Sequence, residues 1–386
     1  MAEIYYIKGT IYAQNRIIQN ARMAVAETGK IRAIGGADLP IPDGAEVRDV
    51  SGLLVLPGFI DIHIHGGSGF GVMNATFADL DGISRFHAST GTTTFLATTS
   101  TGSLERLTEA LKTAAAAIGK TSGAELAGIH LEGPYLDATR RGAQSLEHLR
   151  LPVPDEIESL LEAAKGHIRI VTLAPEIPGG YAAVRQLAQK GVTVSIGHSN
   201  ATYEQVEEAV RNGVHHTTHH FNGMSPFHHR DPGVAGAGLM MPELTTELIC
   251  DGIHVHPAAA KFLFETKSPD RVCLVTDAVP LAGMPDGVYG NHIVKDGAIR
   301  LADSGSLAGS SLSTLQAMKN AMRFTGWPLE KVLPSLTSVP ARQAGLSESK
   351  GALAEGKDAD FLLLTPDLQL VSTYVRGKAV YSAGQS

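Results

Sequence analysis

Residues 59–65 read Phe-Ile-Asp-Ile-His-Ile-His, a short apolar run that ends in two histidines. Side chains alternate along a β-strand, so His63 and His65 share one face of this predicted strand. Further apolar runs of similar length follow along the chain, and segments with helical periodicity separate them. This alternation is typical of βα units around a parallel sheet.

The predicted strands of this sheet number eight. They are 59–64, 93–97, 126–131, 168–173, 192–196, 215–218, 246–250 and 272–275. Glycines at 91, 166, 191 and 213 precede strands at positions where left-handed helix caps are expected. Eight βα units predict a (β/α)8 TIM-type barrel of the α/β class. A doubly wound open sheet is the alternative, but only the weak match Gly66-Gly67-Ser68-Gly69 follows the first strand.

Both ends of the chain have short β-type runs separated by Gly, Asn and Lys. These runs are 4–7, 16–18, 23–26 and 31–34 at one end, and 360–364, 368–371 and 375–380 at the other. We therefore predict that 1–54 and 350–386 together form a small β-sandwich domain. The barrel, at 55–349, would be the catalytic domain inserted between them.

The composition of the 386 residues excludes several classes of protein. A hydrophobic fraction of 43% excludes a disordered chain, and a net charge of −7 provides no electrostatic basis for binding nucleic acid or an anionic membrane. No apolar run is long enough to span a bilayer. Two cysteines cannot form a disulfide framework, and no basic-then-apolar leader is visible, so we expect a cytoplasmic protein.

Polar residues collect where the predicted strands end, which is the catalytic face of such a barrel. Besides the histidine pair of the first strand, they are Glu132, His198, His219, His254 and Asp277. Each alone has an ordinary explanation as a turn, a helix cap or a hydrogen-bonded histidine, but packing does not explain their coincidence. Imidazoles and carboxylates without thiolates suit zinc, iron or manganese in an open site. A metal beside a carboxylate base is typical of hydrolases.

The motifs resemble those of a known family. Residues 57–66, Pro-Gly-Phe-Ile-Asp-Ile-His-Ile-His-Gly, resemble the first-strand signature of the amidohydrolase superfamily. Leu131-Glu132-Gly133-Pro134, Gly197-His198-Ser199, His219 to Met224, Asp251-Gly252-Ile253-His254 and Val275-Thr276-Asp277-Ala278 narrow the resemblance to its N-acetylglucosamine-6-phosphate deacetylases. The resemblance covers essentially the whole chain. It implies removal of acetate from N-acetyl-D-glucosamine 6-phosphate, giving D-glucosamine 6-phosphate, in amino-sugar catabolism and cell-wall sugar recycling.

The same resemblance implies roles for single residues. Glu132, His198 and His219 would hold the principal metal, and His63 and His65, which some members replace, would hold a second. One or two divalent ions per chain are implied, zinc or iron first, with manganese or cobalt as alternatives. Asp277 would be the general base and acid, and His254 would help to polarise the carbonyl. The implied substrate contacts are Ala143, Asn222, Gly223, Arg230, His254, Leu307, Ala308 and Gly309. Gln144 stands where some relatives carry histidine, so its role stays open.

The expected partner is a phosphorylated N-acetyl amino sugar. The resemblance also implies a homodimer in which Arg230 reaches the neighbouring subunit's site; the ordinary alternative is a surface loop where Arg230 pairs with Asp231.

Three other functions stay open. A deacetylase for N-acetylgalactosamine 6-phosphate differs in its substrate by one hydroxyl. A cyclic-amide hydrolase of the same superfamily often bridges its metals with a lysine after the fourth strand, but 173–176 read Leu-Ala-Pro-Glu, so Glu132 must supply the bridge. The third alternative is an inactive scaffold that keeps the barrel but not the chemistry. The complete set of metal ligands argues against it.

Overall fold

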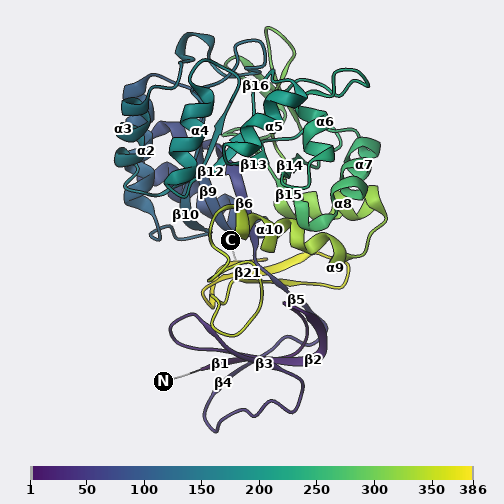
Figure 1. Cartoon of the computed structure of the whole chain (residues 1–386). Helices are drawn as coiled ribbons and strands as arrows, with labels where there is room; N and C mark the ends of the chain where they lie inside the picture. Colours follow the sequence, from purple (N-terminus) through teal and green to yellow (C-terminus); the bar gives the residue numbers. More distant parts are fainter. Residues whose placement is uncertain (1–2, 385–386) are drawn as a thin grey trace.

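The computed structural model describes residues 3–384, so residues 1–2 and 385–386 of the predicted small domain lie outside the described residues. Eight strands pair in parallel, each with the next barrel strand along the chain, and form a nearly closed barrel (Figure 1). They are β6 (Phe59–Ile64), β9 (Thr92–Thr99), β10 (Glu125–Glu132), β11 (Ile168–Leu173), β12 (Thr193–Ile196), β13 (Val214–Thr217), β14 (Thr245–Ile249) and β15 (Val272–Val275). The barrel prediction and all eight strands are confirmed, with small shifts of their ends.

The barrel closes between its first and last strands. The N–H group of Asp277 donates to the carbonyl oxygen of His63 at 2.9 Å, and Ile64 and Ala278 form a parallel bridge. Beneath them the fully buried carboxylate of Asp61 accepts a hydrogen bond from the Thr276 hydroxyl at 2.6 Å. Closure therefore brings the ends of β6 and β15 side by side.

Helices cover the outside of the barrel. The α-helices are α1 (Phe77–Ala88), α2 (Leu104–Ala117), α3 (Pro154–Ala163), α4 (Gly180–Gln189), α5 (Tyr203–Arg211), α6 (Gly233–Met240), α7 (Pro257–Lys267), α8 (Thr314–Thr325), α9 (Leu329–Val332) and α10 (Ser338–Gln343), and short 3-10 turns are η1 (Val72–Asn74), η2 (Leu146–His148), η3 (Pro269–Arg271) and η4 (Leu333–Leu336). The predicted cap glycines 91, 166, 191 and 213 all have positive φ, from 75° to 118°. Between residues 3 and 384, no helix combines the length and the apolar character needed to cross a bilayer.

Strands from both ends of the chain share a second sheet, which lies below the barrel in Figure 1. It contains β1 (Ile4–Ala13), β2 (Arg16–Val25), β3 (Ile31–Gly35), β4 (Glu46–Asp49), β5 (Leu54–Pro57), β20 (Phe361–Leu364), β21 (Leu370–Val375) and β22 (Lys378–Ser382). The ring of Tyr6 in β1 lies 4.8 Å from that of Phe361 and 5.5 Å from that of Tyr374, centroid to centroid. The sheet is therefore continuous but curls over its own aromatic core. The exact domain limits stay a prediction.

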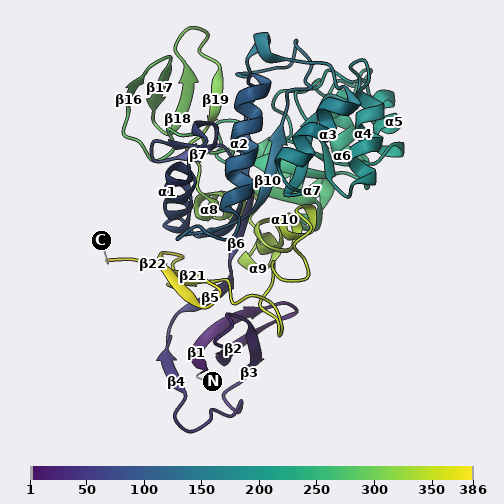
Figure 2. The same cartoon turned by 90° about the vertical axis from the view of Figure 1, so that its left-hand side faces the viewer.

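Two features differ from the sequence-based expectation. The expected strands 16–18 and 23–26 are one strand, β2, because a bulge between the register pairs Gly9–Ala21 and Ile11–Ile18 accommodates Asn20, whose φ is 48°. A four-stranded antiparallel sheet, which the sequence did not lead us to expect, lies between β15 and α8. It consists of β16 (Gly287–Tyr289), β17 (His292–Lys295), β18 (Ala298–Leu301) and β19 (Leu307–Ser310), and stands at the far end of the barrel from the small sheet (Figure 2). A hairpin of β7 (Gly66–Gly67) and β8 (Phe70–Gly71) follows β6.

A buried lysine joins the small sheet to the barrel. The side chain of Lys350 is only 3% exposed, and its Nζ lies 2.6 Å from Asp360, 3.0 Å from Glu125 and 3.1 Å from Asp358. Glu125 begins barrel strand β10, whereas the two aspartates precede β20 of the small sheet. The single ammonium group therefore compensates carboxylates of both parts of the chain.

We expect Lys350→Met to destabilise the chain by about 3–5 kcal/mol, because breaking a buried ion pair leaves uncompensated buried charges. Urea unfolding followed by circular dichroism measures the change. The control is Lys8→Met, which removes a pair with Asp49 whose side chains are 55% and 49% exposed and should change stability far less. Equal stability losses in both variants would contradict the structural role of Lys350.

Candidate active site

A cavity of about 620 Å³ opens at the carboxyl ends of the barrel strands. Most of the predicted site residues line it: His65, Glu132, Ala143, His198, His219, Asn222, Gly223, His254, Asp277, Leu307, Ala308 and Gly309. His63 is fully buried beside the cavity, with its Nε2 atom 3.2 Å from Nε2 of His65. Arg230 is the predicted site residue that the fold of a single chain does not bring there.

Glu132, His198 and His219 form one compact group. Glu132 is the last residue of β10, and the two histidines follow the ends of β12 and β13. Oε1 of Glu132 lies 3.2 Å from Nε2 of His198 and 3.3 Å from Nε2 of His219. The three ligating atoms are close enough together to hold one metal ion.

His63, His65 and Asp277 form a second group next to the first. Oδ1 of Asp277 lies 3.4 Å from Nε2 of His63 and 3.3 Å from Nε2 of His65. Oε2 of Glu132 lies 3.3 Å from Nε2 of His65, so the Glu132 carboxylate faces both groups. This position suits a carboxylate that bridges two metals.

Three of these side chains depend on an unusual backbone conformation. His198, His219 and Asp277 have φ values of 49°, 30° and 50°, which residues with a Cβ rarely adopt. Each is the second residue after a barrel strand. The left-handed residue turns the chain sharply at the rim. Strain of this kind persists where the surrounding structure enforces it, and it is concentrated at functional sites.

The ring nitrogens of the first group show that a cation fits between them. Nδ1 of His198 donates to the Arg140 carbonyl at 2.9 Å, and Nδ1 of His219 donates to the Asn222 carbonyl at 3.1 Å. A neutral imidazole carries one proton, so both Nε2 atoms present lone pairs. These two atoms lie 3.1 Å apart and face the Glu132 carboxylate. Electron-rich atoms so close together repel one another unless a cation lies between them, which is the arrangement of a metal site.

The pKa values follow from the same electrostatics. Burial alone would lower the pKa of His63, but Glu247, Asp277 and Glu132 outweigh it and raise that pKa to about 10. Burial is likewise outweighed at His65, whose pKa rises to about 9. Burial would raise the pKa values of Glu132 and Asp277, yet the neighbouring histidines hold both below their ordinary values. The site therefore attracts positive charge, and protons and a divalent cation compete for it.

The seventh strand contributes an imidazole with one free edge. Nδ1 of His254 lies 2.6 Å from Oδ2 of Asp251, whose other oxygen accepts from the backbone of the same turn. The ring lines the cavity, so its Nε2 edge is left to contact a ligand. Asp251 therefore orients the ring of His254, a role that the motif 251–254 did not reveal.

Two glycines bring backbone close to the site. Gly223 has a φ of 58°, and a Cβ there would lie 3.0 Å from Nδ1 of His198. Gly309 of β19 has a φ of 70°, and a Cβ would lie 2.1 Å from Cγ1 of Val279. Next to Gly309, the N–H group of Ser310 donates to the Asp277 carbonyl at 2.9 Å. The inserted sheet is thus anchored on the loop that carries the aspartate.

Sequence reasoning left Gln144 open and missed Glu247. The Gln144 amide donates to Oε2 of Glu132 at 2.6 Å and accepts from the N–H group of Thr101 at 2.8 Å, so it orients that carboxylate. Glu247 is fully buried in β14 and contacts His63. The sequence did contain a signal for Glu247, which is a lone carboxylate inside the apolar run 246–250. A buried strand tolerates a charge only when the charge is paired, so a partner for this carboxylate could have been expected.

Arg230 lies on an exposed loop before α6. Its guanidinium contacts Nε2 of His229 at 2.7 Å. Within the described residues Arg230 forms no ion pair with Asp231. The alternative explanation, a surface loop held by an Arg230–Asp231 pair, is therefore not observed. The role of Arg230 in a neighbouring subunit's site stays a prediction.

Comparisons with known proteins show which family the chain resembles over nearly its whole length. A family model described as the amidohydrolase family matches residues 54–380. The chain is 37% identical over 389 aligned positions to the N-acetylglucosamine-6-phosphate deacetylase of Bacillus subtilis, covering 99% of this chain and 98% of that protein. It is also 37% identical to an N-acetylgalactosamine-6-phosphate deacetylase of Escherichia coli O157:H7, covering 88% and 90%. A solved structure of an aspartate-to-alanine variant of N-acetyl-D-glucosamine-6-phosphate deacetylase from Mycobacterium smegmatis, in complex with N-acetyl-D-glucosamine-6-phosphate, matches with a TM-score of 0.92 and 32% identity, covering 99% of this chain and all of that one.

Proposed function

The chain belongs to the amidohydrolase family, and from this premise we infer that it removes the acetyl group of N-acetyl-D-glucosamine 6-phosphate. The observation that carries the inference is the arrangement around Glu132: two ligand groups and Asp277 share the rim of one cavity. The relatives named for this reaction match over nearly the full chain, and a structural neighbour holds this sugar phosphate. The products are acetate and D-glucosamine 6-phosphate.

The site fits a divalent cation, for which we propose Glu132, His198 and His219 as the principal ligands. When bound, such an ion polarises a carbonyl and makes water more acidic, and an acetamide, as a poor electrophile, needs both effects. The remaining steps belong to the chain's own side chains. We propose zinc or iron as the metal, with manganese or cobalt as alternatives.

Asp277 is placed to move the proton that the reaction requires. Its pKa lies below the ordinary value, so the carboxylate is ionised at neutral pH and can accept a proton from the attacking water. As the C–N bond breaks, the same proton goes to the sugar nitrogen, which would otherwise leave as an amide anion. His254 contacts the carbonyl oxygen, and Asn222 with the backbone of Gly223 holds the sugar. Ala143 and Leu307 to Gly309 line the rest of the cavity.

We expect the purified chain to release acetate from N-acetyl-D-glucosamine 6-phosphate faster than from the galactosamine epimer. Asp277→Asn should lower kcat by about 10²–10⁴-fold, because an amide fills the space but cannot accept the proton. A coupled acetate assay with both sugars measures the rates, and metal analysis of each protein provides the control. An Asp277→Asn protein with most of the wild-type activity would assign the proton transfer elsewhere, and a preference for the epimer would favour the alternative substrate.

We propose that His63, His65 and Asp277 would hold a second metal ion, and the Glu132 carboxylate faces this group as well as the first. Elemental analysis after metal saturation and gel filtration should give two equivalents per wild-type chain. Replacing both His63 and His65 with asparagine removes the imidazoles and should leave one equivalent. One equivalent in both proteins would show that the histidine pair does not bind metal.

We also propose a cytoplasmic homodimer in which Arg230 completes the partner's phosphate pocket. Arginine's planar fork suits phosphate oxygens, and the loop that carries Arg230 is exposed and lies outside its own cavity. Cys250 and Cys273 are free and buried, which suits a reducing compartment.

Mixing an Arg230→Ala chain with an Asp277→Asn chain tests the shared site. In each mixed dimer one site lacks both groups and the other keeps both, so activity should return to about a quarter of the wild-type value for random exchange. Acetate release after subunit exchange, with mixed dimers counted by native mass spectrometry, measures this. If mixed dimers form and activity stays at the level of the two parents, Arg230 does not act across the interface.

A further inference from the structure

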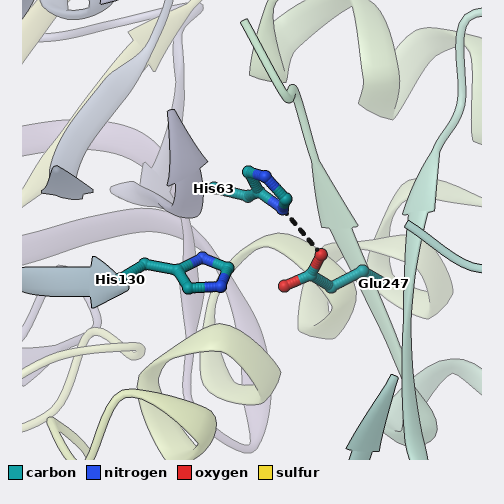
Figure 3. Close-up of side chains that lie close together, drawn as sticks. All are labelled: His63, His130 and Glu247. Carbon is teal, nitrogen blue, oxygen red and sulfur yellow. Dashed lines mark hydrogen bonds and ion pairs between the residues drawn. The ribbon is translucent and has the colours of Figure 1, made fainter. Parts of the chain in front are cut away.

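Glu247 is a fully buried acid that the proposed reaction does not use. It lies in β14, its side chain is 0% exposed, and it does not line the cavity. Figure 3 shows its carboxylate pointing at the ring of His63, across the barrel interior from His130. An ionised carboxylate in such a place is costly unless several donors face it.

The Glu247 carboxylate has three such donors. Oε2 accepts from Nδ1 of His63 at 2.9 Å and from the backbone N–H group of His219 at 3.0 Å. Oε1 lies 3.2 Å from Nε2 of His216. One oxygen atom of Glu247 therefore contacts one residue from each of the two ligand groups.

From these contacts we propose that Glu247 is a positioning residue for the two metal-ligand groups, an inference that rests on the proposed metal site. By accepting the Nδ1 proton of His63, it leaves the lone pair on Nε2, which faces His65 at 3.2 Å and Asp277 at 3.4 Å. The hydrogen bond on the far nitrogen also sets the ring orientation and makes Nε2 a stronger donor to a metal. At His219 the bond to the backbone supports a residue whose φ is 30°.

A separate metal site at His63, His130 and Glu247 is the alternative, since their ligating atoms lie close together. The contacts of His130 argue against it. Its Nδ1 lies 3.0 Å from the Ile62 carbonyl and its Nε2 2.7 Å from the Thr172 hydroxyl, so neither nitrogen is free. Both Glu247 oxygens are occupied as well. These residues support the metal site from below the cavity.

Zinc titration of the metal-stripped full chain, in competition with a chromophoric chelator, tests the proposal. Glu247→Gln keeps an acceptor oxygen but loses the charge, and Glu247→Leu removes both. We expect the second equivalent of zinc to bind about tenfold more weakly in the first variant and about hundredfold more weakly in the second, the range found for such supporting groups. Partial retention by the glutamine variant is the pattern expected of positioning, because the hydrogen bond to His63 remains.

Asp360→Asn is the matched control, because it also neutralises a buried acid but at the opposite end of the barrel, beside Lys350. It should lower the thermal midpoint without changing zinc affinity. Proton NMR of the zinc-loaded proteins adds a direct signature: the slowly exchanging Nδ1–H resonance of His63 should persist in Glu247→Gln. This measurement and the glutamine titration decide the matter if the leucine variant does not fold.

Wild-type affinity for both equivalents in the glutamine and leucine variants would overturn the proposal. A wild-type chain that binds a single equivalent would refute the second metal, which is a separate result. In that case the zinc affinity of the single remaining site tests the role of Glu247. A tenfold lower affinity in Glu247→Gln supports its action through His219, and an unchanged affinity overturns the proposal.

Discussion

Mutual repulsion of unshared electron pairs is the constraint around which this site is built. Four imidazole nitrogens and two carboxylates converge on a space that a metal ion can fill. Such convergence does not arise spontaneously, because each group alone is better solvated by water. The fold enforces it in two ways. Each imidazole has a contact at its other nitrogen, and three loop residues adopt left-handed backbone at the rim.

The parallel barrel supplies the remaining part of this constraint. All eight strands deliver their carboxyl ends to one rim, so residues far apart in sequence meet there. The closure between β6 and β15 places the His63 backbone against that of Asp277. The buried carboxylate of Glu247 on β14 also contacts His63 through the interior of the barrel. Closure therefore brings His63 of the first strand beside Asp277, which follows the last, and Glu247 of the seventh strand contacts the same histidine.

Much of this was predictable from the sequence. The barrel strands are continuous apolar runs that end in Gly or polar residues, and that pattern is visible without a structure. Gln144 was harder, because it lies in a long loop with little regular structure, where periodicity provides no signal. The β16–β19 sheet has short strands with exposed residues such as Val288, so its pattern resembles a loop. Glu247 was missed because the alternation of side chains along a strand does not by itself show whether an acidic side chain points into the barrel or out of it.

The pairing of β5 with β20 has a consequence for biosynthesis. Pro57 and Phe361 are register partners, although the whole barrel separates them in the chain. During translation, β1, β2 and β5 emerge from the ribosome long before β20 and β21 exist, so their hydrogen-bonding edge and the ring of Tyr6 stay uncovered while the barrel grows. Non-local pairings of this kind form slowly and leave strand edges open to the wrong partners. The earliest strands of the nascent chain therefore stay exposed to incorrect pairing until synthesis is nearly finished.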